Sequence, residues 1–284
     1  MNILVTGANG QLGSEIRKLV TNSVKNTYFF TDTTDLDITN LKKVASFVVD
    51  NQVDIIVNCA AYTQVDKAED NVTAADLVNH MAVANLAKVC KQQGVKLIHI
   101  STDYVFSGSK NRPYTEQDAE QPLGVYGRTK FDGEQAIRTE GIPHLIIRTS
   151  WLYSSFGHNF VKTIQKLSAE RTELKVVFDQ VGTPTYAADL AEFILYVIEN
   201  DLFKNKQETY HFSNEGVCSW FDFATEIVRL SGNECKVTPC LSDEFPAKVK
   251  RPHYSVLDKS KLKNDFQYAV PHWKKSLEKM LTSG

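Results

Sequence analysis

Three glycines spaced three residues apart near the N-terminus constrain the fold of this chain more than any other feature. Gly7, Gly10 and Gly13 lie between an apolar run at residues 2–5 and a longer amphipathic stretch. The first glycine permits a tight turn from strand to helix, the second lets the backbone approach a pyrophosphate, and the third allows close packing of helix on sheet. The spacing therefore predicts a dinucleotide-binding βα unit at the start of the chain.

Short apolar runs alternate with longer amphipathic stretches through the first half of the chain, which is typical of repeated βαβ units and a parallel sheet. Gly94 is a suitable left-handed cap for one of the helices. The fold class is therefore expected to be α/β, with a Rossmann-like doubly wound parallel sheet. The expected strands are residues 2–5, 28–30, 54–58, 96–100 and 144–148, and the clearest helices are residues 41–51 and 74–93.

The sequence pattern changes after residue 150. A strand is expected at residues 174–178, followed by a helix at residues 187–199 that returns to the first domain. From residue 210 onward, short apolar segments are separated by prolines, as in a smaller lobe. The expected dinucleotide-binding domain is residues 1–150 plus roughly 179–209, and the smaller C-terminal substrate-binding lobe is roughly residues 151–178 and 210–284.

Composition and charge exclude several classes of protein. The formal net charge is −2 and no cluster of Lys and Arg is interleaved with aromatic residues, so nucleic acid is not an expected partner. No apolar run approaches the ~20 residues of a membrane span, so no membrane association is expected. The first predicted strand begins next to Met1, which leaves no room for a signal peptide and favours the cytoplasm. The five cysteines are scattered without Cys-x-x-Cys spacing, so we expect neither disulfides nor a metal site.

Asp32 follows the second predicted strand at the distance where an acid accepts hydrogen bonds from the adenosine ribose of a dinucleotide. No Lys or Arg lies between Asp32 and Asp37 to neutralise a 2′-phosphate, so NADH should be tolerated at least as well as NADPH. Ile38 offers an apolar face for the adenine. The expected cofactor contacts from these segments and from the end of the third strand are Gly7, Gly10, Gln11, Leu12, Gly13, Asp32, Asp37, Ile38, Ala61, Tyr62 and Thr63.

Tyr126 and Lys130 are four residues apart, a little over one helical turn. A lysine at this spacing can hold its ammonium beneath the tyrosine ring, and together with a cationic nicotinamide ring it could lower the pKa of the hydroxyl from ~10 toward ~7. Such a pair arises easily by chance, but here it follows a phosphate loop and Thr102, which ends an apolar strand where ligands bind. We therefore expect Tyr126 to protonate a carbonyl oxygen that Thr102 orients, and Lys130 to tune Tyr126 and bind the nicotinamide ribose.

Four segments carry a resemblance to known proteins, namely residues 65–69 (VDKAE), 101–106 (STDYVF), 125–130 (VYGRTK) and 148–151 (RTSW). They resemble the extended short-chain dehydrogenases/reductases, and among these the dTDP-4-dehydrorhamnose reductase family, over almost the whole chain. The resemblance implies reduction of the C4 ketone of dTDP-4-dehydro-L-rhamnose to dTDP-L-rhamnose, a sugar donor for cell-surface polysaccharide, with NADPH or NADH.

The same resemblance implies a set of site residues. A diphosphate requires donors and a cation, which adds polar residues of the second half of the chain as candidates. The role of Tyr104 stays open between contact with the substrate and packing against the strand end. The implied catalytic residues are Thr102, Tyr126 and Lys130, and the implied substrate contacts are Thr102, Asp103, Tyr126 and Trp151, with Asn159, the turn at residues 182–185 and Arg251 as further candidates.

Some relatives form a homodimer through a magnesium site made of glutamates, so the resemblance is compatible with a homodimer here. Glu15 and Glu192 fall at suitable positions. Lone glutamates on helices are usually solvated, and no metal is predicted.

Two other functions remain as alternatives. One is a related nucleotide-sugar epimerase or 4,6-dehydratase, although dehydratases of this group carry adjacent Asp and Glu after the threonine, and Tyr104 stands at the second position here. The other is a non-catalytic nucleotide-binding protein similar to the regulatory subunit of methionine adenosyltransferase. Such a protein does not need Thr102, Tyr126 and Lys130 together, but their presence does not prove turnover.

Overall fold

The central sheet of the protein is parallel and doubly wound. The computed structural model describes residues 1–21, 25–244 and 248–282, and these contain a six-stranded sheet in the order β10-β5-β4-β3-β1-β2. The chain winds one way from β1 to β2 and the other way from β1 through β3, β4 and β5 to β10, which confirms the predicted Rossmann-like fold. The strands are β1 (Asn2–Thr6), β2 (Thr27–Thr31), β3 (Ile55–Asn58), β4 (Lys96–Thr102), β5 (His144–Thr149) and β10 (Gln207–His211).

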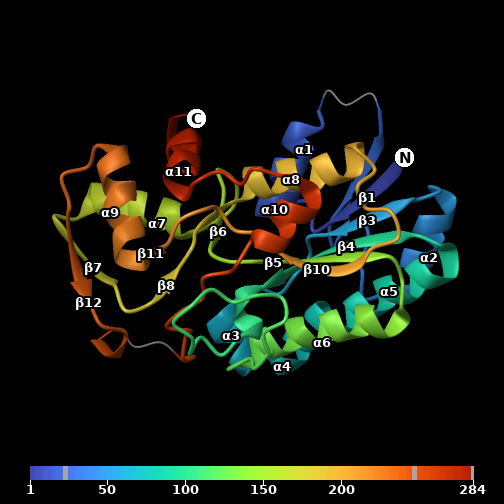
Figure 1. The fold of residues 1–284 in the computed structure, drawn as a ribbon, viewed down its shortest axis with the longest axis horizontal. Helices are drawn as coiled ribbons and strands as arrows, with labels where there is room; N and C mark the ends of the chain where they lie inside the picture. The colour runs from blue at the N-terminus through green and yellow to red at the C-terminus, as the bar shows by residue number, and fades with distance from the viewer. Residues whose placement is uncertain (22–24, 245–247, 283–284) are drawn as a thin grey trace.

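Helices cover both faces of this sheet, which explains why its inner strands are apolar on both sides (Figure 1). Ile3 and Val5 of β1 pack with one set of helices, whereas Leu4 between them packs with the other set. The first set is α1 (Gln11–Leu19), α8 (Ala187–Glu199) and α10 (Ser260–Phe266), and the second is α2 (Leu41–Asp50), α5 (Ala82–Gln93) and α6 (Val125–Glu140). None of the described helices is long and apolar enough to cross a membrane.

A π-helical turn interrupts the helix that the sequence predicts at residues 74–93. The structure has α4 (Val72–Asp76), the π turn Leu77–Met81 and then α5, which ends at Gly94 with a φ of 70° as predicted. The π turn places Asn79 against α6, where a Cβ on Gly133 would lie 2.2 Å from the carbonyl oxygen of Asn79. Gly133 therefore lets α6 approach this turn closely.

Asn79 also joins three segments of the cofactor side of the molecule. Its Oδ1 accepts from the backbone N–H of Tyr62 (2.9 Å), and its Nδ2 donates to the carbonyl of Tyr62 (3.1 Å) and to Oγ1 of Thr129 on α6 (3.2 Å). The side chain is fully buried. It therefore fixes the chain after β3 relative to the helix that carries Tyr126 and Lys130.

A second group of elements lies beside the sheet, at the left of Figure 1. It has its own apolar cluster, which includes Tyr153, Phe223, Ile227 and Trp273. Its helices are α7 (Phe160–Glu170), α9 (Trp220–Ser231) and α11 (Trp273–Thr282), and its strand pairs are β7 (Glu173–Val177) with β12 (Lys236–Cys240), β8 (Val181–Gly182) with β11 (Cys218–Ser219), and β6 (Leu152–Tyr153) with β9 (Thr185–Tyr186). The short helix α3 (Val65–Asp70) lies near α6.

The predicted division of the chain at about residue 210 falls inside β10, which pairs with β5 as far as His211 and Arg148. In addition, α10 packs on the main sheet through Leu262 and Phe266, although the sequence prediction assigned it to the lobe. An edge strand that begins Gln-Glu lacks the apolar run of a central strand, so its sequence does not reveal the pairing. We therefore propose that the first part of the chain includes β10 and α10.

The contact between α6 and the π turn predicts the effect of Gly133→Ala. A methyl group there meets a backbone oxygen, so we expect a loss of about 1–3 kcal/mol in the free energy of unfolding, measured by urea denaturation. Gln135→Ala is the control, because Gln135 is exposed on the same helix. Alanine normally favours a helix over glycine, so an unchanged or increased stability of Gly133→Ala would contradict the close contact.

Candidate active site

A cavity of about 570 Å³ lies at the carboxyl ends of the central strands. It is bounded by the loop after β1, the ends of β4 and β5, the start of α6, and residues of the second group of elements. This is the position where open parallel sheets bind ligands. The cavity brings together many of the predicted site residues, namely Gly7, Gly10, Gln11, Leu12, Ala61, Thr63, Thr102, Asp103, Tyr126, Lys130, Trp151, Asn159 and Arg251.

The glycine loop has the backbone geometry that its spacing predicts. Gly7 has a φ of +63°, and a Cβ on it would lie 2.6 Å from Cα of Ala60, so both the conformation and the space require glycine. Gly10 is the N-cap of α1 and supplies no side-chain acceptor, which leaves the amides of the first turn to the cavity. A Cβ on Gly13 would lie 2.6 Å from Cα of Ala8, so Gly13 packs against its own loop.

Gly13 does not line the cavity, and neither do four other predicted cofactor residues. The carboxylate of Asp32 accepts from the N–H of Asn9 in the glycine loop (3.1 Å), so it lies beside the loop. Oδ1 of Asp37 accepts from N–H and Oγ1 of Thr39 (2.9 and 2.7 Å), as in a turn. Ile38 is 7% exposed and packs in the core, and Tyr62 is held through its backbone by Asn79. Their predicted roles therefore stay predictions.

Thr102, Asp103 and Tyr104 form a compact turn at the end of β4. Oγ1 of Thr102 donates to Oδ1 of Asp103 (3.1 Å) and accepts from the N–H of Tyr104 (3.2 Å). Burial raises the pKa of the Asp103 carboxyl to about 7, and the hydroxyls of Ser255 and Thr102 offset part of this effect. The ring of Tyr104 packs edge-on against Tyr126, 5.4 Å between centroids, and also lines the cavity.

Tyr126 has a raised pKa. Burial raises the pKa of its hydroxyl to about 12, Thr102 lowers it in part, and Asp103 raises it. This shift is opposite in direction to the expected one, and the expectation that Lys130 and a cationic nicotinamide ring together bring the pKa toward neutrality stays a prediction. Burial is the largest cause of the shift, and Nζ of Lys130 is directed at the carbonyl of Ile100 (2.6 Å) on β4. Burial also lowers the pKa of Lys130 itself to about 8.

A buried ion pair holds α6 in register with the sheet. Nε and Nη2 of Arg148 on β5 donate to the two carboxylate oxygens of Glu134 (2.9 and 2.6 Å), and both side chains are fully buried. Ser101 of β4 donates to the same carboxylate (2.5 Å). Burial raises the pKa of Glu134, but Arg148 and Arg138 more than compensate, so the net shift is downward. Since Glu134 follows Lys130 by one turn, this network places Lys130 and Tyr126 opposite the end of β4.

Two stacked tryptophans form one wall of the cavity. The rings of Trp151 and Trp220 lie 3.6 Å apart and nearly parallel. Trp151 has a φ of +48°, and a Cβ on Gly182 would lie 2.7 Å from its ring, so Gly182 makes room for it. The predicted turn at residues 182–185 thus supports the wall without lining the cavity. Trp220 was missed from sequence because nothing near it in the chain reveals the contact.

Asn159 and Arg251 have partners of their own at the cavity. Asn159 caps α7 through Oδ1, and its Nδ2 donates to Oε1 of Gln11 (3.0 Å) and to the carbonyl of Ser154 (2.7 Å). Arg251 pairs through Nη2 with Oδ2 of Asp66 on α3 (3.2 Å). Asn159 therefore ties α7 to the glycine loop, and Arg251 places a cation at the cavity wall.

The two glutamates considered for magnesium also have protein partners. Glu15 is 1% exposed and accepts from Oγ of Ser154 (2.6 Å), whereas Glu192 pairs with Lys279 (2.8 Å). The absence of a metal stays a prediction.

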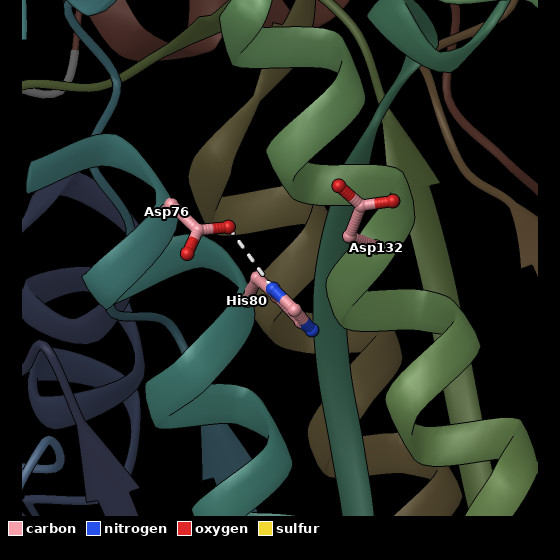
Figure 2. A group of neighbouring side chains, drawn as sticks. All are labelled: Asp76, His80 and Asp132. Carbon is pink, nitrogen blue, oxygen red and sulfur yellow. Dashed lines mark hydrogen bonds and ion pairs between the residues drawn. The ribbon is translucent and has the colours of Figure 1, made fainter. Parts of the chain in front are cut away.

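A separate group of possible metal ligands lies where α4 and the π turn meet α6 (Figure 2). Asp76, His80 and Asp132 have potential ligand atoms within 4.8 Å of one another, and Nδ1 of His80 lies 3.0 Å from Oδ1 of Asp76. All three side chains are partly exposed, and none lines the cavity. The proximity of these three side chains is the only sign of a cation in the described part of the chain. Because no second observation supports it, we assign no metal to this group.

The doubly wound sheet, the glycine loop and the cavity with Thr102, Tyr126 and Lys130 are the arrangement of a short-chain dehydrogenase/reductase. The model of the RmlD substrate binding domain family matches residues 1–284. A dTDP-4-dehydrorhamnose reductase of Aggregatibacter actinomycetemcomitans is 37% identical, with 97% of each chain covered. The chain belongs to this family, which confirms the resemblance that the sequence motifs carry.

Solved structures agree with this assignment. The dTDP-4-dehydrorhamnose reductase of Clostridium acetobutylicum has a TM-score of 0.95 and 43% identity, with 100% of this chain and 99% of that chain covered. The enzyme of the same name from Bacillus anthracis, solved in complex with NADP, has a TM-score of 0.94 and 39% identity over 100% of this chain and 99% of that one.

The raised pKa of Asp103 predicts a pH-dependent difference in stability. The unfolded carboxyl ionises near pH 4 and the native one at about 7, so folding binds a proton between these values and stability falls as the pH rises through them. We expect Asp103→Asn to be up to about 3 kcal/mol more stable relative to wild type at pH 8 than at pH 5.

Urea denaturation of both proteins at the two pH values measures this difference. Asp243→Asn serves as the control, since Asp243 is exposed. A difference between Asp103→Asn and wild type that stays constant with pH would show that Asp103 titrates normally.

Proposed function

We propose that this protein is an NAD(P)H-dependent oxidoreductase that reduces the C4 ketone of dTDP-4-dehydro-L-rhamnose to dTDP-L-rhamnose. The observation that carries the proposal is the meeting of Thr102, Tyr126 and Lys130 with the glycine loop around one cavity. Membership of the family and the names of its closely similar relatives support the substrate class. The product is a sugar donor of dTDP-rhamnose biosynthesis.

The residues around the glycine loop fit a nicotinamide dinucleotide. A Cβ on Gly7 would meet the backbone at Ala60, and the first turn of α1 offers amides that no capping side chain uses. Such a turn suits a pyrophosphate. The bound cofactor supplies hydride, and the residues that would hold it include Gly7, Gly10, Gln11, Leu12 and Lys130.

Tyr126 is suited to give a proton rather than to take one. Its raised pKa keeps the hydroxyl protonated at neutral pH, which is the form that a carbonyl reduction consumes. Thr102 lies beside it, and its hydroxyl can be redirected from Asp103 to the reacting oxygen. Lys130 adds positive charge near the same point when protonated, which favours the phenolate that remains after proton transfer.

The wall of stacked tryptophans and Arg251 suit the nucleotide-sugar. An indole face offers apolar contact to a sugar ring, and a guanidinium is a good partner for a diphosphate. Asn159 has a donating amide at the junction with the phosphate loop. We assign the substrate to this side of the cavity, between Trp151 and Arg251.

Arg17 is a further candidate cofactor residue that the sequence pattern does not reveal. Arg17 of α1 lies with both Nη atoms 3.5 Å from Oδ1 of Asn9, whose backbone N–H donates to Asp32, and it stacks over Phe30 at 5.0 Å. Asn9 therefore connects a cation to the carboxylate expected at the adenosine ribose. We propose that Arg17 accommodates the 2′-phosphate of NADPH while Asp32 accepts from the 2′-hydroxyl of NADH.

The alternatives lack a comparable observation. Elimination of water requires a second carboxylate after Asp103, and the structure has the ring of Tyr104 there, packed against Tyr126. The relatives from Aggregatibacter actinomycetemcomitans, Clostridium acetobutylicum and Bacillus anthracis are named as reductases, in agreement with carbonyl reduction.

Tyr126→Phe tests the function directly. With dTDP-4-dehydro-L-rhamnose, wild type should consume NADPH or NADH, and Tyr126→Phe should lose roughly 10²–10⁴-fold in kcat while its Kd for NADP⁺ stays within about threefold, because only the acid is removed. Tyr196→Phe, which removes a hydroxyl on α8, is the control. No consumption by wild type, or stoichiometric NAD that stays bound through purification, would contradict a reductase.

Arg17→Ala tests the basis of cofactor use. We expect its KM for NADPH to rise roughly fivefold or more with little change for NADH, because an exposed cation beside a phosphate contributes about 1 kcal/mol. Lys18→Ala on the same helix controls for a general loss of positive charge. Equal effects on both cofactors would remove Arg17 from the 2′-phosphate site.

A further inference from the structure

A buried chain of polar side chains lies directly behind Lys130. Oγ1 of Thr6 donates to Oδ1 of Asn58 (2.6 Å), and Nδ2 of Asn58 lies 3.0 Å from Nδ1 of His99. Nε2 of His99 lies 3.3 Å from Nζ of Lys130. All four side chains are at most 1% exposed. Each polar atom therefore needs a partner inside the protein, and the donors and acceptors can be assigned one by one.

The orientation of the Asn58 amide follows from a neighbouring backbone group. The N–H of Ala60 lies 3.2 Å from Oδ1, and a backbone N–H can only donate. The amide oxygen therefore faces Ala60 and Thr6, and the amide nitrogen faces His99. Because an amide nitrogen offers no lone pair, it donates to Nδ1 of His99, which must accept.

The accepting Nδ1 determines the tautomer of His99. Burial lowers the pKa of this imidazole well below its ordinary value, and Lys130 and His144 lower it further, so the ring is neutral at physiological pH. A neutral imidazole that accepts at Nδ1 carries its proton on Nε2. The N–H at Nε2 then points at Lys130, and only the uncharged amine of a lysine has a lone pair that can accept it.

We propose that His99 is a positioning residue for Lys130: held by Asn58 with its proton on Nε2, it donates a hydrogen bond to the lysine amine and favours the uncharged lysine. The amine in turn donates to the carbonyl of Ile100 (2.6 Å). Nζ is therefore held at the end of β4 by one hydrogen bond that it accepts from His99 and one that it donates to Ile100. Protonation of Lys130 turns the contact with His99 into one between two donors.

The charge of Lys130 thus depends on what enters the cavity. A bound dinucleotide brings negative charge, which favours the ammonium, so its binding is coupled to uptake of a proton by Lys130. This coupling rests on the proposed function, because that function assigns the dinucleotide to the cavity. The tautomer of His99 and the protonation of Lys130 in the free protein do not depend on it.

Other titratable groups also face these two side chains. Burial is the largest cause of the lowered pKa of Lys130, and Glu134 on α6 and Cys59 after β3 act in the opposite direction. His144 on β5 acts on His99. None of these groups explains the order of donors and acceptors along the chain from Asn58 to Lys130, so that order supplies an effect that can be tested separately from burial.

The first measurement is the tautomer itself. In protein labelled with ¹⁵N-histidine, the resonances of the His99 ring nitrogens are assigned by their disappearance in His99→Gln. In wild type they should show a proton on Nε2. Asn58→Asp places a carboxylate opposite Nδ1, which should move the proton to Nδ1. A proton on Nδ1 in wild type, or a charged ring at neutral pH, would overturn the proposal.

The second measurement is the titration of Lys130, followed through its ¹³Cε resonance and assigned with Lys130→Met. In Asn58→Asp the His99 ring carries its proton on Nδ1 and accepts at Nε2. The midpoint of the Lys130 titration should therefore rise by at least one pH unit, which is a tenfold change in the ratio of charged to uncharged lysine. Asn58→Asp in a His99→Phe background controls for the added negative charge. An equal rise in that background would show that charge alone is responsible and would refute the role of His99.

Calorimetry of NADPH binding in buffers of different ionisation enthalpy tests the coupling, because the reduced nicotinamide ring is neutral and the dinucleotide then brings only negative charge. Near pH 8, wild type should take up part of a proton, and Lys130→Met should not. Circular dichroism verifies the fold of each variant, and His99→Gln replaces His99→Phe if the latter does not fold. If NADPH does not bind, the proposed function fails, whereas the two resonance measurements still decide the role of His99.

Discussion

The placement of the candidate catalytic helix depends on one buried ion pair. Glu134 of α6 and Arg148 of β5 are both fully buried and joined by two hydrogen bonds. Removing either partner of such a pair leaves an uncompensated charge and typically costs about 3–5 kcal/mol. The alignment of α6 on the sheet that satisfies both charges and Ser101 also brings Tyr126 to Thr102.

Close approach of backbones provides the rest of the geometry. Gly7 lets the phosphate loop reach the end of β3, and Gly133 lets α6 reach the π turn. Asn79 then joins the backbone of Tyr62 to Thr129 of α6. Buried hydrogen bonds therefore connect the proposed cofactor side of the cavity, at Tyr62, with α6, which carries the proposed proton donor Tyr126. A substitution on one side is expected to affect the other.

The environment of the two central ionisable groups differs from what their spacing predicts. Four residues on a helix bring Tyr126 and Lys130 to one face, but spacing contains no information about burial or about partners on the sheet. Burial raises the pKa of Tyr126 and lowers that of Lys130, and the nearest polar atoms to Nζ belong to β4. A phenol is thereby available as a proton donor, and the charge of the lysine becomes dependent on its surroundings.

Much of this protein was determined by its sequence alone. The glycine spacing, the apolar runs and the motifs at Thr102 and Tyr126 predicted the sheet, the phosphate loop and the family, because local conformation and strand burial depend on residues close together in the chain. Only the tertiary structure decided the pairing of β10, the contact of Trp151 with Trp220, the hydrogen bonds that connect Arg17 to Asp32 through Asn9, and the partnership of His99 with Lys130. These contacts join segments far apart in sequence, or depend on burial, and the local pattern of residue types does not specify either.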